Sequence, residues 1–273
     1  MKGRSQQLVG LPKVLPAESP ASWLTRAALS QGVVIGELLK FAGIANVDDI
    51  DLAFLGPRFR DLANLFGFDK TSFRDARQII VSLTKLYPKG GRFLLKTPSG
   101  RPRYRVCPRC AATQRTPYFA IHCRFAVWRF CPDHHCMMED ACWNCEATID
   151  LPGSLACDGP MRGKCAYLSQ CLKCGRPFFR GAALSLGELA SVLTEFEFHE
   201  LMNGRAALAA LYQRRVMLAA GLPGRFSSLR EYERLGILGT RKQAPTADAL
   251  RARDAVRIAS VGADATNSGE RRE

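Results

Sequence analysis

The chain has 273 residues, of which 47% are hydrophobic and 23% charged, and its mean hydropathy is -0.09. This composition excludes a wholly disordered chain and a collagen-like repeat. No stretch approaches the roughly 18 apolar residues of a membrane span. No apolar signal-peptide core follows the basic start, so we expect an intracellular, cytoplasmic protein. A total of 39 Lys and Arg against 25 Asp and Glu gives a formal charge of +14, which favours an anionic partner.

Helical periodicity runs through the first ninety residues. Ser19 followed by Pro20 is a helix-start signal, and apolar residues then recur at helical spacing until Gly32. Further helices, each bounded by a glycine or a proline, are expected over 34–42, 58–66 and 71–86. The segment 1–90 is therefore predicted to be a helical, helix-turn-helix-like domain.

The composition of the sequence changes at Lys89, where Gly, Pro, Arg and aromatic residues replace the helical pattern. Short strands are expected around 93–96, 104–106 and 120–130. In the later part, Ser185 and Glu188 have the spacing of a capping box, and helices are expected over 205–220 and 229–235. The predicted fold class is mainly α with small zinc-binding β modules. Its parts are the helical domain (1–90), a double zinc-finger region (91–180), a C-terminal helical region (181–240) and a disordered tail (241–273).

Four pairs of potential metal ligands, each with two residues between its members, stand in the middle third of the chain. They are Cys107 and Cys110, Cys131 and His134, Cys142 and Cys145, and Cys171 and Cys174. Eleven cysteines without an export signal favour metal binding over disulfides. Four N or S donors complete the tetrahedron that Zn²⁺ accepts, so we expect two structural zinc ions with the pairs used in sequential order. A cross-brace, in which pairs one and three share an ion, is the alternative.

The other candidates for chemistry have simpler interpretations. Cys123, Cys136, Cys157 and Cys165 are expected to be buried or spare thiols, unless one of them replaces a chosen ligand. Four protein ligands leave no open position for catalysis on either ion. The stretch 159–165 resembles a P-loop but has three rather than four intervening residues and a Cys where Ser or Thr must bind Mg²⁺. We predict that the chain is not an enzyme.

Two blocks of the sequence resemble the TniQ/TnsD family of transposition proteins. The first is PAESPASWL at 16–24, which is similar to the family's opening P-x-E-S-x-x-S-W-L pattern. The second comprises CPRC at 107–110, CPDH at 131–134 and CWNC at 142–145, and it is similar to the family's metal-binding knuckles. The resemblance covers about residues 11–180 and is specific in the combination of the two blocks.

The resemblance implies a non-catalytic adaptor for DNA transposition target selection. Such a protein links a target-recognition element, either DNA or an RNA-guided CRISPR effector, to an AAA+ regulator ATPase and a transposase. The resemblance is also compatible with a homodimer, and it does not specify the target sequence. Two alternatives remain on the residues alone: a RING-like cross-brace module acting as a ubiquitin-type ligase, and a helix-turn-helix transcriptional regulator.

Two stretches are candidates for contact with nucleic acid. The helices expected over 58–66 and 71–86 have the length and turn of a helix-turn-helix, although an ordinary helical hairpin has the same pattern. The window 76–132 contains no Asp or Glu and interleaves arginines with aromatic residues, which suits phosphate contact and base stacking. The expected contact residues are Lys70, Thr71, Arg74, Arg77, Arg92, Lys96, Arg101, Arg103, Arg105, Arg109, Arg124 and Arg129.

Overall fold

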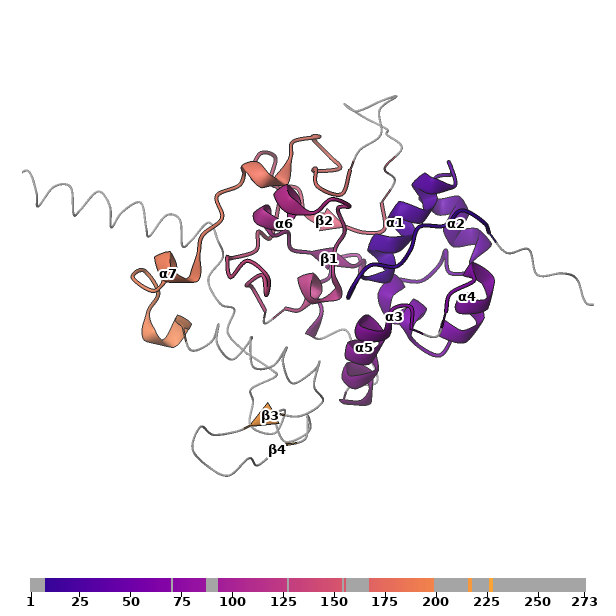
Figure 1. Ribbon diagram of the computed structural model, residues 1–273, viewed down its shortest axis with the longest axis horizontal. Coiled ribbons are helices and arrows are strands. Elements are labelled where there is room, and N and C mark those ends of the chain that lie inside the picture. Colours follow the sequence, from indigo (N-terminus) through magenta and orange to yellow (C-terminus); the bar gives the residue numbers. More distant parts are fainter. Residues whose placement is uncertain are drawn as a thin grey trace, which may run out of the picture.

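A computed structural model describes residues 8–69, 71–86, 93–126, 128–153, 155, 167–198, 216–217 and 226–227. Helices form the first part of the chain, and short strands, turns and single-turn helices form the part that holds the cysteines (Figure 1). The prediction of a mainly helical protein with small β modules is confirmed. Among the described residues, no helix has the length and apolar character needed to cross a membrane.

Five helices come first along the chain, and short strands and short helices follow them. The α-helices are α1 (Pro20–Ser30), α2 (Ile35–Phe41), α3 (Ile50–Leu55), α4 (Phe59–Phe66), α5 (Arg74–Leu86), α6 (Pro108–Thr113) and α7 (Leu186–Leu189). The 3₁₀ helices are η2 (Ile121–Arg124) and η3 (Phe178–Arg180). The strands are β1 (Arg103–Tyr104), β2 (Ile149–Asp150), β3 (Val216–Met217) and β4 (Phe226–Ser227), and they pair antiparallel as β1 with β2 and β3 with β4.

The start of α1 forms as its sequence predicts. The Ser19 hydroxyl accepts a hydrogen bond from the Ser22 N–H at 3.2 Å, which satisfies one of the free donors at the helix start. Pro20 occupies the first helical turn. At α7, Ser185 and Glu188 form the predicted capping box, with both reciprocal hydrogen bonds present.

Several elements differ from the sequence predictions, and the strand expected over 93–96 forms only isolated bridges, at Leu94 and Lys96. Helix α3 was not expected, although Asp49 caps it by accepting the N–H of Leu52 at 3.2 Å. The strand expected over 120–130 contains η2 instead, and only isolated bridges such as Leu94 with Phe125 pair this region. Of the helix expected over 205–220, the described residues Val216–Met217 form a strand. The helix expected over 229–235 and the tail 241–273 lie outside the described residues.

An aromatic cluster fills the core of the helical segment. Trp23 of α1 lies 5.2 Å from Phe66 and 4.7 Å from Phe68, measured between ring centroids. Phe54 of α3 and Phe73 pack against the same rings. Burying each such side chain contributes about 1.5–3 kcal/mol to folding, so this cluster fixes α1, α3 and α4 around one centre.

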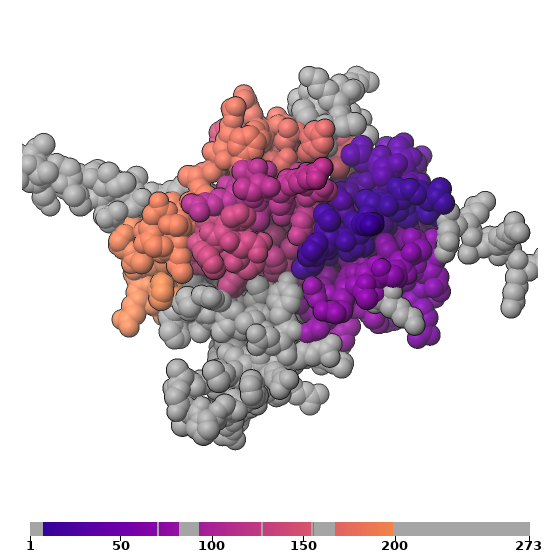
Figure 2. Space-filling view, in the orientation of Figure 1, coloured from indigo at the N-terminus to yellow at the C-terminus, as the bar shows by residue number. Residues whose placement is uncertain are grey.

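The helical segment and the cysteine-bearing segment share this core. The backbone N–H of Ser19 donates to the Phe119 carbonyl at 2.9 Å, and that of Ile121 donates to Ala17 at 2.8 Å. Figure 2 shows the indigo and violet helical segment lying directly against the magenta one. A domain boundary near residue 90 therefore stays a prediction, while the contacts across it are extensive.

A buried ion-pair network also joins the two segments. Arg124 of η2 has a fully buried side chain, and its guanidinium lies 2.8 Å from Asp49 Oδ2 and 2.6 Å from Asp51 Oδ2 at the start of α3. The Tyr104 hydroxyl donates to the Asp51 carboxylate. Burial alone would raise the pKa of Asp49, but Arg124 holds that pKa below its ordinary value. Burial raises the pKa of Asp51, and the positive charge of Arg124 opposes that rise.

We predict that Arg124→Leu lowers the free energy of unfolding by about 3–5 kcal/mol, because it leaves the buried Asp51 without a cation and Asp49 with Lys96 alone, 3.5 Å away. Urea denaturation of the metal-loaded protein measures this. Arg101→Leu is the matched control: Arg101 comes from the same basic stretch but is exposed, so its removal should change stability by no more than about 0.5 kcal/mol. Equal stability of the two variants would show that Arg124 does not hold the segments together.

Candidate metal centres

The first Cys/His cluster brings together Cys107, Cys110, Cys131 and His134. Cys107 caps α6, and its sulfur accepts the N–H of Cys110 at 3.3 Å, so the start of the helix places both sulfurs on one side. The Sγ atoms of Cys110 and Cys131 lie 3.5 Å apart. His134 Nδ1 lies 3.7 Å from the sulfur of Cys107, 3.3 Å from that of Cys110 and 3.5 Å from that of Cys131.

These separations fit a tetrahedral metal. Zinc bonds of about 2.3 Å to sulfur and about 2.0 Å to nitrogen place neighbouring sulfurs about 3.8 Å apart and sulfur and nitrogen about 3.5 Å apart. All four donor atoms lie within 4.8 Å of one another. A single ion at their centre would therefore reach each donor without a change of fold.

The orientation of the His134 ring is supported by Thr113 at the end of α6. The Thr113 hydroxyl donates to the Arg109 carbonyl at 2.8 Å, so towards His134 Nε2, 3.5 Å away, it acts as an acceptor. A proton on Nε2 leaves the lone pair of Nδ1 free, which is the form of histidine that binds a metal. The ring thus presents Nδ1 to the three sulfurs.

The second cluster brings together Cys142, Cys145, Cys171 and Cys174. The sulfurs of Cys142 and Cys174 lie 3.7 Å apart, and those of Cys145 and Cys171 lie 3.6 Å apart. These distances match the sulfur separation expected around one tetrahedral ion. The chain therefore has two Cys/His clusters that are positioned to bind metal ions.

In all four ligand pairs the residue after the second ligand donates its N–H to the carbonyl of the first, and the first pair does so at the start of α6, from Ala111 to Cys107 at 3.0 Å. The other three pairs form a separate kind of turn. Their hydrogen bonds measure 2.9 Å from His135 to Cys131, 2.9 Å from Glu146 to Cys142 and 2.8 Å from Gly175 to Cys171. Each of these three residues has a positive φ. A left-handed residue here turns both ligand side chains inward, although only Gly175 is the residue type that favours this conformation.

The clusters follow the sequential pairing of ligands. The cross-brace alternative is wrong, because pairs one and two form one cluster and pairs three and four the other. A RING-like ligase module loses its structural basis with it.

A single carboxylate connects the two clusters. Asp140 accepts from Arg105 Nε at 2.9 Å and from Arg129 Nη1 at 2.8 Å, and Arg103 lies 3.4 Å away. Burial lowers the pKa of Arg105 to about 10. Burial by itself would raise the pKa of Asp140, yet the arginines hold it below its ordinary value. Since Arg105 and Arg129 each precede a ligand of the first cluster and Asp140 precedes the second, this ion pair fixes one cluster against the other.

The burial of these side chains corrects part of the expected nucleic-acid interface. Arg105, Arg124 and Arg129 are buried and paired with carboxylates, so they do not face a nucleic acid in this fold. Lys96 is half-buried and lies 3.5 Å from Asp49. Arg103 is half-buried beside Asp140.

Five of the remaining candidates are accessible. The exposed ones are Thr71, Arg74, Arg77, Arg101 and Arg109. Arg77 lies over the Phe59 ring at 4.6 Å, on the face of α5 that leads towards α4. Lys70 and Arg92 lie outside the described residues.

The cysteines outside the two clusters differ in their surroundings. Burial raises the pKa of the Cys123 thiol, which keeps it protonated and small in the core. Cys136 is buried with its sulfur 3.5 Å from that of Cys107, yet it does not belong to either set of mutually close donors. Its proximity to the first cluster was not predicted, since no paired spacing marks it. Cys157 and Cys165 lie outside the described residues.

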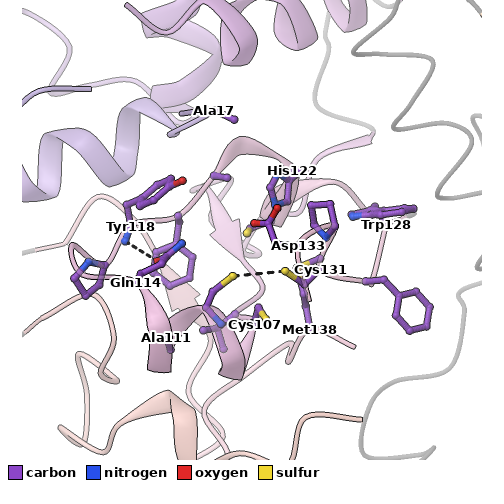
Figure 3. Close-up of a pocket in the computed structure, with 18 of the residues that line it drawn as sticks. Ala17, Cys107, Ala111, Gln114, Tyr118, His122, Trp128, Cys131, Asp133 and Met138 are labelled. Atoms are coloured by element: carbon purple, nitrogen blue, oxygen red, sulfur yellow. Dashed lines mark hydrogen bonds between the residues drawn. The ribbon is translucent and has the colours of Figure 1, made fainter. Parts of the chain in front are cut away.

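A cavity of about 530 Å³ adjoins the first cluster. In Figure 3 the sulfur-bearing side chains of Cys107 and Cys131 lie in its wall, with Tyr118 on one side and Trp128 on the other. His122 and Asp133 lie close to each other at its edge. Burial lowers the pKa of His122, which favours a neutral imidazole there.

We predict that Cys145→Ser lowers the bound metal from two ions per chain to one, because it removes a ligand from the second cluster only. Inductively coupled plasma mass spectrometry of the purified protein measures the ratio, and Co²⁺ absorption identifies the cluster that remains. Cys123→Ser, at a cysteine outside both clusters, should keep both ions. Retention of two ions in Cys145→Ser, or loss of both with the fold intact, would contradict independent clusters.

The comparison with known families covers the chain from residue 10 through the first cluster. Residues 10–138 match the TniQ family model, a span that runs from the segment before α1 past both ligand pairs of the first cluster. No curated protein matches the chain. Residues 10–138 are therefore similar to the TniQ family, and the rest of the chain lies outside this match.

Proposed function

We propose that the chain is a non-catalytic adaptor for target selection in DNA transposition. The observation that carries this proposal is the TniQ match over residues 10–138. In the proposed role, the chain links a target-recognition element, either DNA or an RNA-guided CRISPR effector, to an AAA+ regulator ATPase and through it to a transposase. An adaptor needs a shape that holds two partners in a fixed relation, and the buried ion pairs at Arg124 and Asp140 support such rigidity.

We further propose Zn²⁺ as the ion of both clusters. Sets of three thiolates with one imidazole and of four thiolates are typical of structural zinc, and each fills all four positions of the ion. A bound zinc would supply a cross-link, with an apparent binding energy of about 10–16 kcal/mol coupled to folding. Because no position is left for water or substrate, a structural rather than a catalytic ion is the natural assignment.

Nucleic acid is the proposed class of anionic partner, and the accessible cations of α5 support this helix as a place of contact. Arg74 and Arg77 lie on the exposed side of α5, the second helix of the helical pair. Asp69 holds the turn before α5 by accepting the N–H groups of Thr71 and Ser72 at 2.7 and 2.8 Å. This placement supports contact of α5 with phosphates.

The adaptor role is tested by affinity purification of the tagged full chain from its native host, with nuclease treatment before elution. We expect mass spectrometry to identify an AAA+ ATPase, together with a transposase or a CRISPR effector. The double variant Cys110→Ser, Cys131→Ser should no longer recover these proteins, because the first cluster cannot form.

Cys123→Ser is the matched control and should retain the same proteins, since this buried cysteine is outside both clusters. Recovery of the intact chain without an ATPase or any transposition protein would contradict the adaptor role.

A further inference from the structure

An exposed aromatic and basic surface lies where the two clusters meet. Trp143 stands inside the third ligand pair with 40% of its surface exposed, and Phe179 of η3 is 51% exposed. Both are large apolar side chains that folding leaves in contact with water. Three exposed cations accompany them: Arg109 in α6, Arg176 and Arg180. These five residues are called the aromatic platform below.

Contacts between the elements hold the platform together. The Trp143 indole N–H donates to the Pro177 carbonyl at 2.9 Å, which fixes the ring beside η3. A methyl group at Gly181 would lie 3.7 Å from both Pro108 and Trp143, so the start of α6 and the Trp143 ring converge on the same residue. Each ring or cation is thus carried by an element that a Cys/His cluster anchors.

The cations of the platform are free to bind an external anion. None of the three guanidinium groups forms an ion pair with a carboxylate in the part of the chain that the structure describes. From Gly159 to Gly187 the sequence contains no Asp or Glu. The Glu188 carboxylate is already bonded to Ser185, and these hydrogen bonds, followed by the charge of Arg109, lower the pKa of Glu188.

We propose that the aromatic platform binds single-stranded nucleic acid, with bases stacked on Trp143 and Phe179 and phosphates held by the arginines. Charge complementarity favours a phosphate backbone, and two exposed rings on a rigid base favour unpaired bases, whose faces are accessible only outside a duplex. This inference rests on the proposed function for nucleic acid as the class of partner, and it adds a second surface apart from α5, with the strand state and the residues that bind.

The test is fluorescence anisotropy with the metal-loaded full chain. The probes are fluorescein-labelled oligothymidylate and oligouridylate about 20 nucleotides long, and a duplex of the same length. We expect either single strand to bind more tightly than the duplex, and the two single-strand arms distinguish DNA from RNA. Trp143→Ala and Phe179→Ala should each weaken single-strand binding about tenfold. The double variant Arg176→Gln, Arg180→Gln should lower the salt slope by about 0.7 for each phosphate that the protein no longer binds.

Matched controls separate the platform from general charge and apolarity. Phe41→Ala removes an aromatic side chain of the same 40% exposure from α2, and Lys40→Gln removes an exposed cation from the same helix; neither should change the affinity. Metal content and thermal melting confirm that each variant is folded.

Three results would overturn the proposal: no binding of either single strand, equal or tighter binding of the duplex, or platform variants that bind like the parent. Equal competition by a poly-glutamate peptide would also overturn it, because charge alone would then explain the binding. Recovery of an ATPase after nuclease treatment does not depend on the platform. Loss of single-strand binding would therefore overturn the platform and leave the adaptor role standing. Single-strand binding without recovery of an ATPase would overturn the adaptor role and leave the platform standing.

Discussion

The contact between Arg124 and the two carboxylates at the start of α3 determines how the cysteine-bearing segment sits on the helices. A buried guanidinium without partners would be strongly unfavourable, and here its two terminal nitrogens meet Asp49 and Asp51 at 2.6–2.9 Å. The same carboxylates are buried and need the cation in return. Because Asp49 also caps α3, the ion pair, the helix start and the position of η2 depend on one another.

Asp140 has the corresponding role between the two clusters, since it ion-pairs with Arg105 and Arg129 of the segment that carries the first cluster. The basic stretch therefore contains two kinds of arginine. Some are buried and hold the fold, while others, such as Arg101 and Arg109, face solvent. Only the second kind is available to a phosphate. The number of arginines in this stretch thus overstates the number of cations that a partner meets.

The features that could be predicted from the sequence are those that depend on residues close together along the chain. The Ser19 cap, the capping box at Ser185 and the paired spacing of the metal ligands are local signals, and the structure contains each of them. Whether an arginine is buried in an ion pair does not depend on its neighbours in sequence, because Asp49 and Asp51 precede Arg124 by 75 and 73 residues. Because the window 76–132 contains no Asp or Glu, no arginine in it has a carboxylate partner close in sequence. Similarly, expected strands shrink to bridges, since turns around the ligand pairs rather than long ladders order this segment.

A shared core and buried ion pairs predict that the helices and the clusters fold as one cooperative unit. Hydrogen exchange with mass spectrometry, on the full chain before and after removal of metal by a chelator, measures this directly. Loss of protection in α1 and α3 together with the region 93–153 is the predicted result. Unchanged protection in α1 and α3, with exchange rising only around the clusters, would contradict a single unit and show that the helices fold independently.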